Sequence, residues 1–139
     1  MYITRQGYPS FNNRPNRVWT AISGDRMLVT KGEVVGDLDD SALEPRTAIG
    51  INQNGRYVYL VVVDGRQPFY SAGATFVELA ELLVEHGAYL AMSLDGGGSS
   101  TMVIEGEDGN PVILNSPIDN LIPTRERPVA NHFGVYVNP

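Results

Sequence analysis

The sequence predicts an α/β fold that borders on α+β, with a mixed β-sheet, one main crossover helix and several β-hairpins. Three observations support this prediction. Short runs of β-branched and aromatic residues dominate the chain, one pair of runs flanks an Asn-Gly dipeptide, and a single helical apolar stripe lies between two further apolar runs. At 139 residues the chain is long enough for one domain, expected over residues 1–139, and too short for two ordinary ones.

The first part of the chain is expected to form an irregular arm followed by short strands. Its first sixteen residues are rich in Gly, Pro and Asn, which are typical of turns. The strands that follow are expected at Arg17 to Ser23, Arg26 to Thr30 and residues 33–35, and a polar loop is expected at Gly36 to Pro45.

A β-hairpin is the clearest local prediction. The dipeptide Asn54-Gly55 is typical of a type I′ turn, and its flanks are β-branched and aromatic. Counting outward from this turn pairs Arg46 with Val63, so Arg46 comes to the same end of the hairpin as Asp64. The second strand is apolar on both faces near its end, which predicts a central strand covered on both sides.

One helix is predicted over residues 74–88. Thr75 and Glu78 have the spacing of a capping box, and Gly87 suits the position just past the helix end. An apolar strand follows at residues 89–94. A strand, a helix and a strand in this order predict two strands that run in parallel, joined by a right-handed crossover.

Two Asp-Gly pairs follow these two strands. Asp64-Gly65 ends the first strand and Asp95-Gly96 ends the second, so both pairs are expected at one edge of the sheet, where ligands bind in such folds. A turn residue is the ordinary role of an aspartate before glycine. Two carboxylates at one edge are also the usual equipment for cleaving a glycosidic bond. The glycines after Asp95 lead into a strand-like segment, which excludes a P-loop and a dinucleotide fingerprint.

Composition limits the partners. The net charge of −6 argues against a nucleic-acid binder and leaves room for a small anionic ligand. No apolar run is long enough for a membrane span, and the start lacks the pattern of a signal peptide, so localisation stays unknown. His86 and His132 have no metal-ligand spacing. No cofactor is identified from the sequence, and a divalent cation is left open.

Several segments together resemble the phosphodiester glycosidase family. They occur in the family's order and extend from Trp19 to Val137: "EPRTAIGI", "VVVDGR", "SAGATFVELAELLVEHGA", "LDGGGSSTMV", "LNSP" and "RERPVANHFGVYV". The resemblance implies hydrolysis of a sugar-1-phosphodiester at the anomeric carbon, which releases free sugar and a phosphate monoester. Bacterial members of this family are often linked to exopolysaccharide, and members are often extracytoplasmic. The last segment is expected to form a final strand.

The resemblance also implies the site. It gives Asp95 and Asp64 catalytic roles, and it places substrate-binding roles on Arg46, Arg66, Gly96, Gly97, Ser99, Asn115 and Arg127. The three arginines would hold the phosphate, and backbone N–H groups from Gly96 to Ser99 would hold ligand oxygens. A module that binds nucleotide or sugar phosphodiesters without turnover is the alternative.

The chain departs from the family pattern in two places. Ser93 stands where the family leads us to expect Asn. The family's usual N-terminal region, with an Asn-Gly and aromatic motif, has no counterpart in this chain. A homo-oligomer or a partner chain that supplies this region is therefore expected, because a sheet with fewer strands has an edge free to pair.

Overall fold

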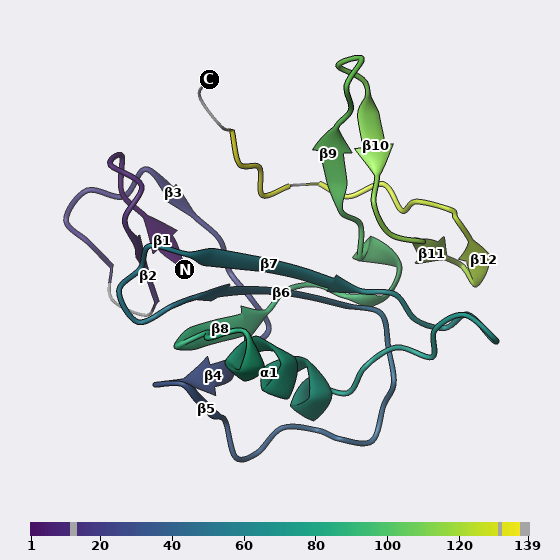
Figure 1. Ribbon diagram of the computed structural model, residues 1–139, viewed down its shortest axis with the longest axis horizontal. Helices are drawn as coiled ribbons and strands as arrows, with labels where there is room; N and C mark the ends of the chain where they lie inside the picture. The colour runs from purple at the N-terminus through teal and green to yellow at the C-terminus, as the bar shows by residue number, and fades with distance from the viewer. Residues whose placement is uncertain (12–13, 131, 137–139) are drawn as a thin grey trace.

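A five-stranded sheet forms the centre of the computed structural model, which describes residues 1–11, 14–130 and 132–136. Helix α1 (Phe76–Glu85) packs on one face of this sheet (Figure 1). All neighbouring strands are antiparallel, in the order β5 (Glu33–Val34), β4 (Arg26–Thr30), β8 (Leu90–Ser93), β6 (Arg46–Ile51) and β7 (Val58–Val63). The predicted sheet-rich fold with one crossover helix and several hairpins is confirmed, as an α+β arrangement.

Local sequence determines both ends of α1. The Thr75 side chain accepts a hydrogen bond from the Glu78 N–H, and the Glu78 carboxylate accepts one from the Thr75 N–H, which is the predicted capping box. Gly87 has a φ of 91° and donates to the Val84 carbonyl, and Ala88 donates to the Leu83 carbonyl. This pair of bonds is a Schellman motif, which satisfies carbonyls that the helix leaves free.

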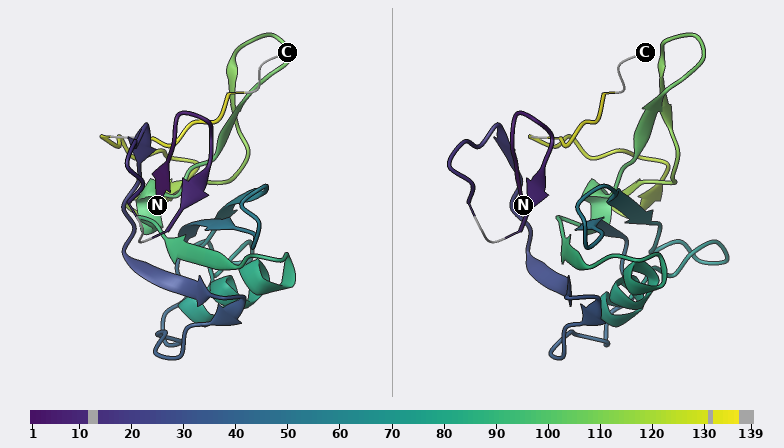
Figure 2. Two further views of the ribbon diagram at one scale, coloured as in Figure 1. Left: turned by 90° about the vertical axis from the view of Figure 1, so that its left-hand side faces the viewer. Right: turned by 60° about the vertical axis from the view of Figure 1, so that its left-hand side comes forward.

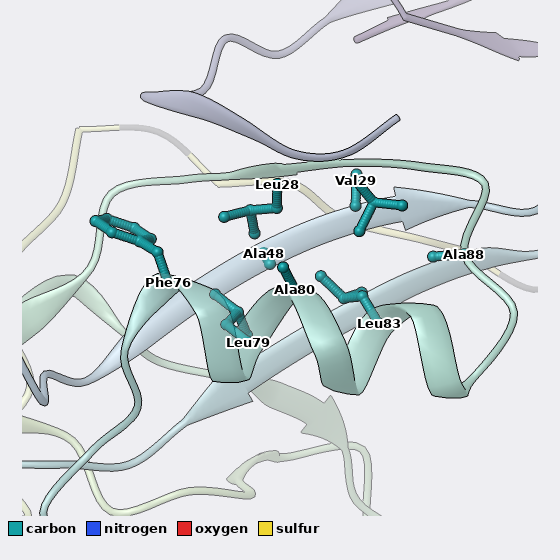
Figure 3. Packing of buried hydrophobic residues seen from close by; sticks show 9 residues of the cluster. Leu28, Val29, Ala48, Phe76, Leu79, Ala80, Leu83 and Ala88 are labelled. Atoms are coloured by element: carbon teal, nitrogen blue, oxygen red, sulfur yellow. The ribbon is translucent and has the colours of Figure 1, made fainter. Parts of the chain in front are cut away.

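The apolar stripe of α1 forms the main core with the sheet. Figure 3 shows the helical side chains facing those of β4 and β6. The buried members of this cluster are Leu28, Val29, Ala48, Phe76, Leu79, Ala80, Leu83, Ala88 and Ala91. The opposite face of the sheet is covered by the N-terminal arm, through a second cluster of Met1, Phe11, Ile49, Ile51 and Met92. The arm itself forms a small sheet, in the order β2 (Pro9–Ser10), β1 (Tyr2–Ile3) and β3 (Thr20–Ala21).

The register of the β6–β7 hairpin agrees with the prediction, and its turn does not. Arg46 pairs with Val63, as counted from the sequence. Gly55 has a φ of 67°, but Asn54 is not among the residues with positive φ, so the turn is not type I′. The Asn52 side chain closes the loop instead, because its oxygen accepts hydrogen bonds from the backbone N–H groups of Arg56 and Tyr57.

The prediction that β7 is a central strand is wrong. β7 is an outer strand of the sheet, and its neighbour β6 is an interior strand, with four buried residues in a row. The apolar run of β7 packs toward α1 through Tyr59, Val61 and Val63, whereas Val58 and Leu60 of the same strand are 42% and 41% exposed. An apolar run alone does not distinguish a strand covered on both faces from one covered on a single face.

The crossover places the ends of β7 and β8 at one edge of the sheet. Both strands are antiparallel to β6, so they run in the same direction, as predicted. They are not neighbours, however, because β6 lies between them.

The chain after β8 forms two further hairpins. β9 (Val103–Glu105) pairs with β10 (Pro111–Ile113), and this hairpin projects from the sheet (Figure 2). β11 (Ile118–Asp119) pairs with β12 (Ile122–Pro123). The expected final strand is not formed within the described residues 128–130 and 132–136. Within the described part of the chain, no helix is long and apolar enough to cross a membrane.

Candidate active site

The two Asp-Gly pairs lie on either side of Pro45, the residue that precedes β6. A Cβ on Gly65 would lie 2.6 Å from the Pro45 nitrogen, and a Cβ on Gly96 would lie 2.8 Å from the Pro45 oxygen. Only glycine permits such close backbone approach without a shift. Asp64 and Asp95 therefore flank the start of β6, with their backbones two strand spacings, about 10 Å, apart.

The Asp64 carboxylate is held within the protein. It accepts hydrogen bonds from the Tyr70 hydroxyl at 2.9 Å, the Asn115 amide at 2.9 Å and the Ser116 N–H at 3.0 Å. The hydrogen bond to this carboxylate raises the pKa of Tyr70, and its negative charge adds to the effect. Asp64 thus anchors the loop after β7 to the chain after β10.

Asn115 completes this network. Its amide nitrogen donates to Asp64 and to the Ser100 carbonyl, and its amide oxygen accepts from the Met102 N–H at 2.8 Å. Both amide hydrogens are used in these bonds. Asn115, which the resemblance expects to bind substrate, therefore links three segments of the chain through hydrogen bonds.

Asp95 lies on a cleft of about 380 Å³. The cleft is lined by Ser23, Gly24, Asp25, Arg46, Phe76, Ser93, Leu94, Asp95 and Gly96. Asp95 is exposed, and its carboxylate has no hydrogen-bond or ion-pair partner among the described residues. Asp64 is not among the lining residues, so the two carboxylates share an edge of the sheet but have different surroundings.

A larger hollow of about 520 Å³ lies within the loop of residues 66–72. Its lining residues include no carboxylate. We place the candidate site at the Asp95 cleft, because Arg46 lines it together with Asp95, whose carboxylate has no partner within the described part of the chain.

Arg46 is fixed at this cleft by three contacts. Its Nε donates to the Ala74 carbonyl and its Nη2 to the Ala42 carbonyl, both at 2.9 Å, and its Cζ lies 3.8 Å from the centre of the Phe76 ring. Burial, more than any neighbouring charge, lowers the pKa of Arg46. No carboxylate lies within ion-pair distance of Arg46 among the described residues, so its charge is not neutralised by a direct partner.

Arg66 forms an ion pair with Glu44. Its φ is 57°, and a Cβ on Gly97 would lie 3.3 Å from both terminal nitrogens of the guanidinium. Arg66 therefore lies against the glycine loop, but part of its charge is already balanced by a carboxylate.

Arg127 lies against Gly98, the next residue of the glycine loop. Its Nε donates to Asp119 at 2.8 Å, and a Cβ on Gly98 would lie 2.7 Å from its Nη2. The Asp119 side chain is only 8% exposed, and the Arg125 Nε is 3.7 Å from its other oxygen. Asp119 thus fixes Arg127 beside the loop.

The glycine loop forms a short 3₁₀ turn, η1 (Gly97–Ser99). The Gly97 N–H donates to the Pro45 carbonyl at 2.8 Å, and the Ser99 N–H donates to the Gly96 carbonyl at 3.1 Å. Two of the four backbone donors expected to hold ligand oxygens are therefore used within the protein. Among the described residues, no group of three or more His, Asp or Glu side chains could hold a metal ion.

Comparison with known proteins gives the family of this chain. A sequence profile described as phosphodiester glycosidase matches residues 2–136. The chain belongs to the phosphodiester glycosidase family. The resemblance of its motifs to this family is thereby confirmed.

Two curated proteins are similar to part of this phosphodiester glycosidase chain. The SPbeta prophage-derived uncharacterized protein YomE of Bacillus subtilis (strain 168) is 39% identical over 69 residues, which cover 50% of this chain and 10% of that protein. The N-acetylglucosamine-1-phosphodiester alpha-N-acetylglucosaminidase of Bos taurus is 38% identical over 66 residues, which cover 48% of this chain and 12% of that protein.

A solved structure extends the comparison to most of the fold. The catalytic domain of the zebrafish N-acetylglucosamine-1-phosphodiester alpha-N-acetylglucosaminidase, auto-inhibited by its pro-peptide, superimposes with a TM-score of 0.64 at 25% identity. The match covers 91% of this chain and 47% of that structure. The chain thus spans about half of the solved relative and about a tenth of the curated ones.

Several residues that shape the site are not predicted by the sequence motifs. Ser116 and Tyr70 hold Asp64, and Glu44 and Asp119 neutralise two of the three expected phosphate-binding arginines. Glu44 lies two residues before Arg46, and an acid so close to a predicted phosphate-binding arginine is a signal of a nearby ion pair. Nothing local distinguishes Asp119 from an ordinary loop aspartate.

Proposed function

We propose that this chain forms the catalytic centre of a phosphodiester glycosidase that hydrolyses a sugar-1-phosphodiester at the anomeric carbon. One observation supports this most directly. Asp95 and Arg46 line the same cleft, and among the described residues neither the Asp95 carboxylate nor the Arg46 guanidinium has an oppositely charged partner. Membership of the phosphodiester glycosidase family supports the reaction class.

The proposed chemistry follows from the two charges. Arg46 attracts the singly charged phosphodiester and stabilises the second negative charge that forms on the phosphate as it leaves. The C1–O bond breaks, and its electron pair stays on the phosphate oxygen. Water supplies the new oxygen at C1, and its proton passes to Asp95, either directly or after Asp95 has first bonded to C1.

A single free carboxylate is sufficient in this proposal. Most glycosidases use a second carboxyl group to protonate the leaving oxygen. A phosphate monoester leaves readily without that proton, since its charge is held by the protein. We therefore assign the chemical step to Asp95, and we assign to Asp64 the task of holding the loop after β7 in place.

The non-catalytic binding module is the second candidate. It is favoured by the hydrogen bonds that occupy Asp64, because only one of the two aspartates is then free to act. Turnover distinguishes the two candidates. Free sugar that accumulates beyond one equivalent supports the enzyme, and intact ligand bound at one equivalent supports the binding module.

The experiment uses methyl α-D-glucopyranosyl phosphate and its N-acetylglucosamine counterpart as substrates. Asp95→Asn is expected to abolish sugar release while it retains binding, and Arg46→Gln is expected to weaken binding. Arg56→Gln is the matched control, because Arg56 is exposed in the hairpin turn at the other end of β6. Full activity in Asp95→Asn would remove Asp95 from the mechanism.

A further inference from the structure

A second guanidinium, that of Arg26, packs against the Phe76 ring besides that of Arg46. The Arg26 Cζ lies 4.2 Å from the ring centre, and the Arg46 Cζ lies 3.8 Å from it. The two residues reach the ring from different strands, with Ser93 of β8 between them, since Ser93 pairs with Arg26 on one side and Ala48 on the other. Ser93 and Phe76 both line the Asp95 cleft. Arg26 is not itself a lining residue, but it follows Asp25, which is, and it therefore lies next to the cleft.

Two like charges on one ring repel each other. Their charged carbons lie at most twice 4.2 Å apart, a separation similar to the screening length of about 8 Å at physiological ionic strength. Burial is the main cause that lowers the pKa of Arg46, and the charge of Arg26 lowers it further. Contact with the aromatic face offsets part of this repulsion. An anion bound beside both guanidinium groups would offset more.

The ion pair of Arg26 is the most exposed of those at this edge. Its Nε lies 2.7 Å from Asp25, whose side chain is 53% exposed. By contrast, the carboxylate partners of Arg66 and Arg127 are 32% and 8% exposed. Exposed ion pairs contribute little free energy, so a ligand anion competes for Arg26 most easily. Asp25 also lines the cleft, so it lies where such a ligand would bind.

We propose that Arg26 is a second phosphate-binding residue of the Asp95 cleft, and that Asp25 holds its guanidinium until a phosphate group replaces the carboxylate. The proposal rests on the proposed function for its substrate class, a sugar-1-phosphodiester. When the C1–O bond breaks, the phosphate passes from one negative charge to two. A second guanidinium stabilises the doubly charged form more than the substrate.

This role predicts a preference that can be measured without turnover. Methyl phosphate carries two charges above its second pKa of about 6, and dimethyl phosphate carries one. Titration calorimetry at fixed, low salt compares the two probes on wild type, Arg26→Gln, Asp25→Asn and the control Arg56→Gln. Wild type is expected to bind methyl phosphate more tightly. Arg26→Gln should weaken methyl phosphate binding by about tenfold, as expected for a hydrogen bond to a charged group.

The two partners of the ion pair should have opposite effects. Asp25→Asn removes the competing carboxylate, so it should tighten methyl phosphate binding, whereas Arg26→Gln weakens it. A purely structural ion pair predicts instead that both variants lower the melting temperature and leave the ratio of the two affinities unchanged. That result would overturn the proposal, as would Arg26→Gln binding like Arg56→Gln, or wild type binding neither probe.

Steady-state kinetics separates this proposal from the proposed function. If the chain is a phosphodiester glycosidase, Arg26→Gln should lower kcat by about tenfold and change KM less, because the second charge appears only as the bond breaks. Equal loss of kcat in Arg56→Gln would contradict the proposal. If wild type binds methyl phosphate as expected but releases no sugar, the glycosidase assignment fails and the anion site at Arg26 stands.

Discussion

Replacing each of the two aspartates by asparagine should have opposite consequences for stability and activity. In Asp64→Asn, the amide oxygen can still accept the partly buried bonds that Asn115 and Ser116 donate to Asp64 Oδ1, but these bonds lose their charged acceptor. Hydrogen bonds to a charged group contribute about 1.5–3 kcal/mol each and neutral ones about 0.5–1.5 kcal/mol, so weakening these two should cost about 2–3 kcal/mol. The exposed hydrogen bond from Tyr70 is not counted in this free energy. In Asp95→Asn no bond within the described residues is lost, and the change should stay within about 0.5 kcal/mol.

Thermal unfolding followed by circular dichroism measures the difference. A loss of about 2–3 kcal/mol in a domain of this size corresponds to a melting temperature lowered by roughly 7–10 °C. Urea unfolding provides the free energy directly, with Arg56→Gln as the unperturbed control. The reasoning would be refuted if Asp64→Asn melted with wild type, or if Asp95→Asn lost as much stability as Asp64→Asn.

Two other predictions follow from the ion pairs and from Tyr70. In chemical denaturation, Arg127→Gln should destabilise the protein by about 1–2 kcal/mol, because it leaves the Asp119 carboxylate, which is 8% exposed, without its nearest cation. Arg66→Gln should cost no more than about 1 kcal/mol, because its partner Glu44 is 32% exposed. Equal losses of stability in the two variants would contradict the difference in burial between Asp119 and Glu44. The pKa of Tyr70 should lie above its ordinary value of 10.0, so the stability from its hydrogen bond is present below that pH and is lost as pH rises through the folded-state pKa. Ultraviolet titration of wild type against Tyr70→Phe measures this pKa, which should fall in Asp64→Asn; an unchanged value would show that Asp64 is not the cause.

Local patterns predicted those parts of the fold that depend on nearby residues. The capping box of Thr75 and Glu78 needs only its own turn of helix, and the pairing of Arg46 with Val63 needs only a hairpin of the right length. The placement of β6 between β7 and β8 could not be predicted, because the order of strands depends on contacts between distant segments. The exposure of Val58 has the same origin.

The sequence predicted which edge of the sheet holds the candidate site, but it did not predict the hydrogen bonds and ion pairs among the site residues. The Asp-Gly pairs come to one edge because β7 and β8 run in the same direction. The roles of the two aspartates differ because Asn115 returns to Asp64 from 51 residues further along the chain, a contact that no local pattern encodes. Likewise, Arg66 and Arg127 looked alike in sequence to Arg46, yet only Arg46 lacks a direct carboxylate partner among the described residues.

The position of the broken bond tests the central claim most directly. Wild-type protein is incubated with a sugar-1-phosphodiester in water labelled with heavy oxygen, and both products are analysed by mass spectrometry. Attack at the anomeric carbon with Asp95 accepting the proton predicts that the heavy oxygen appears on the released sugar, and that Asp95→Asn abolishes this labelling while it still binds the substrate. Heavy oxygen on the phosphate instead would show attack at phosphorus and would contradict the glycosidase assignment.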